Sequence, residues 1–123
     1  MKILNLAAVA AGGAIGASAR YIINLALSGT VESFPLGTLA VNIVGSFIMG
    51  VVMGAGATSL TEYQKVFLTA GIMGGLTTFS TFSFETVRYF STGNYLFAAL
   101  NACLNLALSF AACFVGTVVS GHI

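Results

Sequence analysis

Four long apolar stretches, separated by short polar segments, make up nearly all of this 123-residue chain. They predict helices at about residues 3–27, 36–57, 66–90 and 95–119. A helix of about 20 apolar residues is long enough to cross the hydrocarbon core of a bilayer. We therefore expect an all-α membrane protein, with four transmembrane helices forming a single domain over residues 1–123.

The third of these helices contains a segment that should interrupt it. Each of the adjacent residues Gly74 and Gly75 costs about 1 kcal/mol relative to alanine, and the threonines that follow lose rotamer freedom in a helix. We expect a break near Gly74–Thr78, with Thr77 or Thr78 as the N-cap of the restarted helix. Such a break frees backbone carbonyls, which a membrane tolerates only where they are buried in protein, line a wet cavity or bind an ion.

Two aromatic residues follow the predicted break. Phe79 and Phe82 are three positions apart and therefore share a face of the restarted helix. The edge of an aromatic ring is electropositive, so the edges of two rings attract an anion. An apolar box of ring edges can therefore hold a small anion without a fixed positive charge.

A stripe of small residues marks the first helix. Ala8, Gly12 and Gly16 recur every four positions, a spacing that lets the backbone of another helix approach closely. Arg20 continues the same stripe. Two interpretations of Arg20 remain open: it extends to the lipid headgroups, or it lies at the mouth of an anion pathway.

Polar stripes also run along the second and fourth helices. Asn42 is the informative residue of the second helix, because a buried amide costs several kcal/mol unless it is hydrogen-bonded. It can join two helices, or its N–H groups can replace water around an anion. The stripe of the second helix consists of Thr38, Asn42, Ser46, Gly50 and Gly54. The stripe of the fourth helix, which should face protein or a pathway rather than lipid, consists of Asn101, Asn105 and Ser109.

Two charged residues follow the aromatic pair. Glu85 lies three positions beyond Phe82, and Arg88 three beyond that. This spacing favours an ion pair between Glu85 and Arg88 near a helix end. A role for Glu85 at the mouth of a pore is the alternative.

The composition narrows the class of protein. The chain is 58% hydrophobic and 6% charged, whereas soluble domains carry about 25% charged residues. Its net charge of +1 implies no nucleic-acid partner. The sequence has no catalytic triad, metal-ligand cluster or phosphate loop, so we expect neither an enzyme nor a protein substrate. Cys103 and Cys113 lie roughly 15 Å apart along one helix, too far for a disulfide, and are interpreted as small buried hydrophobic residues.

The basic residues are divided evenly between the two sides of the membrane. Four crossings place Lys2 and Lys65 on one side and Arg20 and Arg88 on the other. The positive-inside rule then gives no preferred orientation. We expect insertion in both orientations and an antiparallel homodimer, because four short helices do not easily enclose a pore.

Three motifs give the chain a family resemblance. Residues 74–83, Gly-Gly-Leu-Thr-Thr-Phe-Ser-Thr-Phe-Ser, resemble the signature of the CrcB/Fluc family of fluoride channels. Residues 12–21, Gly-Gly-Ala-Ile-Gly-Ala-Ser-Ala-Arg-Tyr, resemble the motif of that family's first helix. Residues 35–42, Pro-Leu-Gly-Thr-Leu-Ala-Val-Asn, resemble the motif of its second helix. The motifs occur in the family's order and spacing, in a chain of matching length.

The resemblance implies a fluoride-selective channel of the bacterial plasma (inner) membrane. Passive efflux of fluoride would follow two paths through an antiparallel, dual-topology homodimer in the lipid bilayer. The path residues that the resemblance implies are Phe79 and Phe82 as a phenylalanine box, Asn42, and a polar track of Ser80, Thr81 and Ser83. The helical stripes add Thr38, Asn101, Asn105 and Ser109 to the path, and Arg20 and Glu85 are assigned to the vestibule or pore mouth.

The resemblance also implies a central structural sodium ion. Backbone carbonyls of Gly74 and Thr77 from both subunits would hold it. The alternative function is a small dual-topology, proton-coupled exporter of the multidrug type. Such exporters depend on a carboxylate in the first helix, where this chain has Arg20 and no acidic residue.

Overall fold

The computed structural model describes residues 2–29, 34–54 and 59–121. Among these residues, four helical segments are long and apolar enough to cross a membrane: α1 (Ile3–Leu27), α2 (Leu36–Met53), the interrupted segment Glu62–Ser91, and α6 (Tyr95–Gly121). The expected all-α fold with four membrane-spanning helices is therefore confirmed. The last three residues of the predicted second helix, 55–57, lie outside the described residues.

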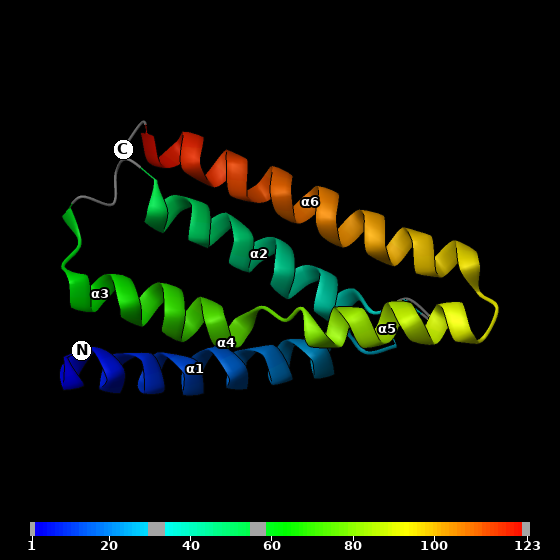
Figure 1. The fold of residues 1–123 in the computed structure, drawn as a ribbon, viewed down its shortest axis with the longest axis horizontal. Helices are drawn as coiled ribbons and strands as arrows, with labels where there is room; N and C mark the ends of the chain where they lie inside the picture. Colours follow the sequence, from blue (N-terminus) through cyan, green and yellow to red (C-terminus); the bar gives the residue numbers. More distant parts are fainter. Residues whose placement is uncertain (1, 30–33, 55–58, 122–123) are drawn as a thin grey trace.

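The chain runs back and forth along an elongated bundle (Figure 1). α1 and the third span run in one direction, and α2 and α6 return in the other, so both described ends of the chain lie at the same end of the bundle. The third span begins at Glu62 as α3 (Glu62–Val66) and continues as the π-helical segment η2 (Phe67–Met73). It then passes through α4 (Gly74–Leu76) and, after a break, α5 (Ser80–Ser91).

Glycines permit the close packing of α1 against the third span. Ala8, Gly12 and Gly16 are the buried residues of α1, as the stripe predicts. A Cβ atom at Gly12 would meet the Phe67 carbonyl oxygen, and one at Gly16 would collide with the Ile72 carbonyl. α2 and α6 are in similarly close contact, because a Cβ at Gly50 or Gly116 would meet backbone of the other helix.

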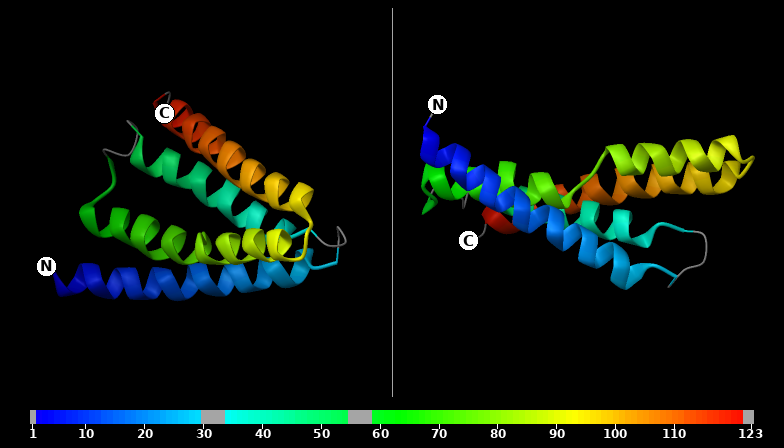
Figure 2. Two further views of the ribbon diagram at one scale, coloured as in Figure 1. Left: turned by 45° about the vertical axis from the view of Figure 1, so that its right-hand side comes forward. Right: turned by 90° about the horizontal axis from the view of Figure 1, so that it is seen from below.

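The third span changes its packing partner at the break. η2 and α4 pack against α1, whereas α5 packs against α6. Figure 2 shows the two halves diverging: seen from below, α5 leaves the side of α1 and runs beside α6. The break therefore lies where the helix crosses from one half of the bundle to the other.

The break lies slightly further along the chain than the adjacent glycines suggested. Gly74 and Gly75 are helical, and the backbone first becomes extended at Thr77 (φ −82°, ψ 156°). A Cβ at Gly75 would meet the Gly13 carbonyl oxygen and the Ala17 nitrogen, so this glycine is needed for packing on α1. The extended conformation at Thr77, and not glycine flexibility, interrupts the helix.

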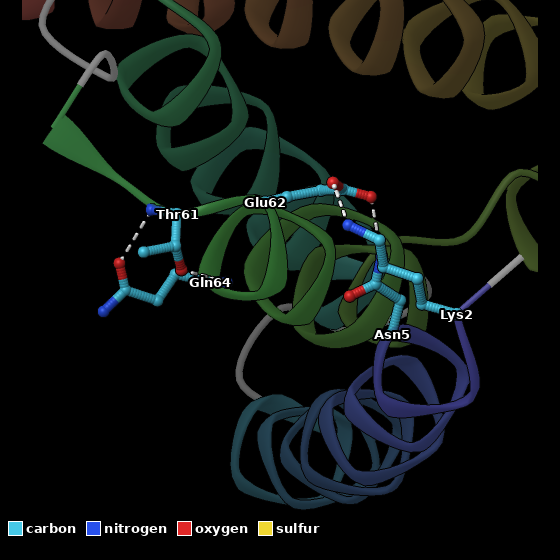
Figure 3. A network of polar contacts seen from close by, with 5 residues as sticks. All are labelled: Lys2, Asn5, Thr61, Glu62 and Gln64. Carbon is cyan, nitrogen blue, oxygen red and sulfur yellow. Dashed lines mark hydrogen bonds and ion pairs between the residues drawn. The ribbon is translucent and has the colours of Figure 1, made fainter.

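A polar network joins the starts of α1 and α3 at the end of the bundle (Figure 3). Glu62 pairs with the Lys2 ammonium at 3.3 Å and accepts a hydrogen bond from the Asn5 amide at 2.7 Å. Thr61 and Gln64 form a capping box, each side chain accepting a hydrogen bond from the other residue's backbone N–H. An exposed ion pair adds only about 0–1 kcal/mol, so the network sets the start of α3 more than it stabilises the fold.

Candidate functional site at the helix break

The Asn42 side chain binds the interrupted backbone directly. Its Oδ1 accepts a hydrogen bond from the Thr78 N–H at 2.9 Å, and its Nδ2 donates to the Thr78 carbonyl at 3.1 Å. One amide side chain thus satisfies both backbone polar groups of a buried residue that has left the helix. The predicted need of Asn42 for hydrogen-bond partners is confirmed, and the partners lie on the third span.

A chain of amides continues from Asn42 into α6. The second Nδ2 hydrogen of Asn42 reaches Asn105 Oδ1 at 3.0 Å, and Asn105 Nδ2 donates to Asn101 Oδ1 at 3.0 Å. Asn101 Nδ2 in turn donates to the Thr86 hydroxyl at 3.0 Å. Asn101 is 0% exposed and Asn105 is 3% exposed, so these two residues of the fourth helix's polar stripe are buried in the bundle.

Hydroxyl groups organise the restart of the helix. Thr78 Oγ1 accepts from the Thr81 N–H at 3.2 Å and donates to Thr81 Oγ1 at 3.1 Å. The N-cap position of α5 is Phe79, so the predicted threonine supplies its capping hydrogen bond from one residue earlier. Thr77 instead donates its hydroxyl back to the Met73 carbonyl at 2.8 Å. The Ser80 hydroxyl lies 3.4 Å from Thr78 Oγ1, and Ser83 donates to the Phe79 carbonyl at 2.9 Å.

Three backbone carbonyls remain free around the break. The Gly75 carbonyl accepts from Arg20 Nε at 3.1 Å, and the Met73 carbonyl accepts from the Thr77 N–H at 3.0 Å. Among the described residues, no hydrogen bond reaches the carbonyls of Gly74, Leu76 or Thr77. These oxygens are available to a ligand.

The two aromatic rings of the predicted box are in contact. The ring centroids of Phe79 and Phe82 are 5.5 Å apart, at an interplanar angle of 65°. Phe82 is 8% exposed, whereas Phe79 is 73% exposed. The pair therefore extends from the interior of the bundle to its surface.

A cavity of about 430 Å³ opens beside the break, between α2, α6 and the third span. Of the residues assigned to the site from sequence, it is lined by Asn42, Thr77, Phe79, Phe82, Asn105 and Ser109. The Ser109 hydroxyl is buried and has no hydrogen-bond partner among the described residues. Sequence reasoning missed several lining residues: Gly45, Ser46, Met49, Met73, Thr78, Leu106, Phe110 and Cys113.

The remaining candidates lie outside the cavity lining. Thr38, which is 2% exposed, donates its hydroxyl to Glu85 Oε2 at 2.9 Å, from α2 across to α5. The favoured ion pair between Glu85 and Arg88 is therefore wrong: Glu85 turns toward α2, while Arg88 is exposed. Glu85 Oε1 is buried and has no partner among the described residues. Ser80, Thr81, Ser83, Asn101, Arg20 and Gly74 are likewise absent from the lining.

The cysteines differ from the expectation of small buried residues. Cys103 is exposed on α6, and Cys113 is partly exposed and lines the cavity. The expectation failed because α6 presents much of its surface outward, so apolar composition alone does not distinguish its two sides. Thr78 was predicted as a cap but not as a residue of the cavity, because its contact with Asn42 depends on how α2 packs.

The fold and the site together define a class of protein. It is a small multi-pass membrane protein built around a discontinuous helix, with free carbonyls, amides and hydroxyls gathered at the break. Irregular backbone of this kind at membrane depth is found where protein buries it or where it lines an ion or substrate site.

Comparison with known proteins identifies the family. Residues 7–117 match the family described as CrcB-like protein, Camphor Resistance (CrcB), and the chain belongs to that family. A relative from Clostridium novyi (strain NT) is 46% identical over 94% of this chain and 92% of its own length, and is named fluoride-specific ion channel FluC. Relatives with the same name occur in Shewanella sp. (strain ANA-3), 46% identical over 91% of this chain and 92% of theirs, and in Shewanella baltica (strain OS185), 45% identical over the same shares. The chain is accordingly a multi-pass protein of the bacterial plasma (inner) membrane.

Proposed function

We propose that this protein is a fluoride channel that lets fluoride leave the cell passively. One observation carries the proposal: relatives named fluoride-specific ion channel are 46% identical over more than nine-tenths of the chain. The proposed activity is transport and not catalysis. Because the weak acid HF enters cells from acid surroundings and dissociates inside, a passive route for the anion is sufficient to remove it.

The proposed path runs beside the helix break. Its electropositive groups are neutral: the ring edges of Phe79 and Phe82 and the hydroxyls of the restarted helix. Such groups can replace the water shell of a small anion without holding it too tightly to leave. The further residues proposed for the path are Thr38, Ser80, Thr81, Ser83, Asn101, Asn105 and Ser109, with Glu85 near its mouth. Asn42 and Arg20 lie at the break beside the path and bind its backbone.

We also propose that two copies pair antiparallel, so that each dimer has two anion paths. The rings of Phe79 and Phe110 support this assembly, because both line the cavity and both are largely exposed. Gly74, with its free carbonyl, is exposed as well. A second copy would cover these groups and complete the cavity.

The free carbonyls fit the proposed structural sodium ion. Sodium is a hard cation that prefers oxygen ligands, and Gly74 and Thr77 each present an unbonded carbonyl oxygen. Two copies of the chain would supply four such oxygens. When bound, the ion would neutralise these dipoles and attract anions nearby. Replacing sodium on both sides of the membrane with a large organic cation should then abolish fluoride flux once the bound sodium has slowly dissociated. Full flux after prolonged exchange would contradict the sodium site.

The decisive test of function is ion efflux from liposomes that hold the purified protein. We expect fluoride to leave down its own gradient without ATP or a proton gradient, and chloride to leave far more slowly. Empty liposomes provide the control. Flux that required an imposed proton gradient would contradict a channel and favour the proton-coupled exporter.

A further inference from the structure

Two side chains from other helices occupy the hydrogen-bonding positions that a continuous third helix would use. In a continuous helix the Thr78 N–H would bond to the Gly74 carbonyl, and the Phe79 N–H to the Gly75 carbonyl. Here Asn42 Oδ1 takes the Thr78 N–H at 2.9 Å, and Arg20 Nε takes the Gly75 carbonyl at 3.1 Å. Each side chain blocks one of the two bonds that would close the break.

We propose that Asn42 and Arg20 are positioning residues that hold the helix open, and that they thereby keep the Gly74 carbonyl free to bind a cation. This inference rests on the proposed function, because the Gly74 carbonyl is one of the proposed sodium ligands. It gives the two residues roles that differ from those assigned to them from sequence, an anion ligand for Asn42 and a pore-mouth cation for Arg20.

The hydrogen bonds of Asn42 decide between the two roles. Both Nδ2 hydrogens are used, one on the Thr78 carbonyl at 3.1 Å and one on Asn105 Oδ1 at 3.0 Å. Asn42 therefore has no N–H left for fluoride unless it gives up a bond to the break or to α6. Asn105 Nδ2 donates to Asn101 Oδ1 at 3.0 Å, which leaves Asn105 Oδ1 pointing at Asn42. This chain of hydrogen bonds fixes the orientation of the Asn42 amide.

Arg20 acts on the other side of the free carbonyls. It lies on α1 one turn beyond Gly16, where α1 and the third span are in closest contact, and it is only partly exposed. The Nε donor is directed at a single backbone oxygen. A lysine at this position would keep the charge but lose the planar guanidinium that directs this hydrogen bond.

The test measures sodium binding without measuring transport. A cation that binds only the folded protein raises its thermal stability, and the rise grows with the logarithm of one plus the ratio of cation concentration to dissociation constant. Purified protein in detergent, without fluoride, is therefore unfolded thermally over a series of NaCl concentrations, with choline chloride keeping the ionic strength constant. We expect the thermal stability of the wild type to rise with sodium concentration. The Asn42→Ala and Arg20→Lys variants should each need at least about tenfold more sodium for the same rise.

Ser46→Ala is the matched control. Ser46 lies one turn from Asn42 on α2 and lines the same cavity, but it makes no hydrogen bond to the break among the described residues. We expect its sodium dependence to equal that of the wild type. If Asn42→Ala does not fold, Arg20→Lys carries the test, because it replaces a partly exposed residue by one of similar size and equal charge.

The outcomes separate this inference from the proposed function. Normal sodium dependence in Arg20→Lys and Asn42→Ala would overturn the positioning role, as would a wild-type stability that ignores sodium. If Asn42 were instead a fluoride ligand, Asn42→Ala would alter fluoride flux and leave the sodium dependence unchanged. Sodium-dependent stability that both variants weaken, in a protein that conducts no fluoride in liposomes, would support the positioning role and refute the proposed function.

Discussion

Phe79 and Phe82 differ in burial, although their rings are in contact. Phe82 is 8% exposed and belongs to the packed interior, so truncating it would leave a void. Phe79 is 73% exposed and contributes little to the packing of a single chain. Substitution at Phe79 therefore separates the effect of a ring edge from the effect of core packing more cleanly than substitution at Phe82.

We predict that Phe79→Ile lowers fluoride flux by about tenfold or more, which corresponds to about 1.4 kcal/mol at the transition state. Isoleucine keeps an apolar side chain of similar bulk but has no electropositive edge. Phe82→Ile should lower flux as well, with an added loss of stability from the core. Efflux of fluoride from liposomes measures the effect.

Phe84→Ile is the control for this prediction, because Phe84 lies on α5, as Phe82 does, and is exposed like Phe79, but does not line the cavity. Its flux should match that of the wild type. Unchanged flux in both Phe79→Ile and Phe82→Ile would show that the rings only pack.

The contact between α1 and the third span brings two helix backbones so close that only glycine fits at some positions. At Gly16 the backbones approach so closely that a Cβ atom would collide with the Ile72 carbonyl. Gly13 is the next glycine toward the N-terminus, and a Cβ there would meet nothing within 4 Å. The two positions share a residue type and a helix, and differ only in what lies opposite.

We predict that Gly16→Ala destabilises the protein by about 1–3 kcal/mol, because the added methyl group forces α1 away from the η2 backbone. Gly13→Ala should be neutral or stabilise by up to about 1 kcal/mol, because alanine is the better helix former. Thermal unfolding of both variants in the same detergent measures the difference. Equal stabilities would mean that the close approach is not required for folding.

The sequence could predict the number of helices and the existence of a break, but not which side chains bind the backbone groups that the break leaves free. Hydropathy is a local property and suffices for the spans. The threonine capping box at Thr61 and Gln64 was readable as well, and it marks the true start of the third span. The Asn42–Thr78 pairing and the Thr38–Glu85 bond join residues far apart in the chain, so they follow from helix packing and not from spacing. The π-helical segment Phe67–Met73 likewise has no signal in hydrophobic periodicity.

At the scale of the whole molecule, the distribution of charge and the exposed surface both bear on the proposed antiparallel dimer. Lys2 and Lys65 lie toward the end of the bundle that holds both described chain ends, and Arg20 and Arg88 lie toward the other end. Neither end carries the excess of basic residues that fixes orientation. In the proposed dimer, a second copy of opposite orientation would cover the exposed rings of Phe79 and Phe110 beside the cavity. A change in charge balance should therefore affect activity without touching the site.

We predict that added lysines at one end of the bundle abolish fluoride flux in cells, and that a partner with lysines at the other end restores it. Ser28→Lys with Ser91→Lys adds charge at the end where α1 and α5 finish, and Ser59→Lys with Tyr63→Lys adds it at the end where α3 begins. All four positions are exposed, so folding should be preserved. Each double variant alone should insert in one orientation by the positive-inside rule and lack an antiparallel partner. Cysteine labelling of the termini reports orientation, and fluoride resistance of cells reports function. Full function of either double variant alone, with labelling that shows one orientation, would refute the antiparallel dimer, because the active assembly would then be built from parallel copies.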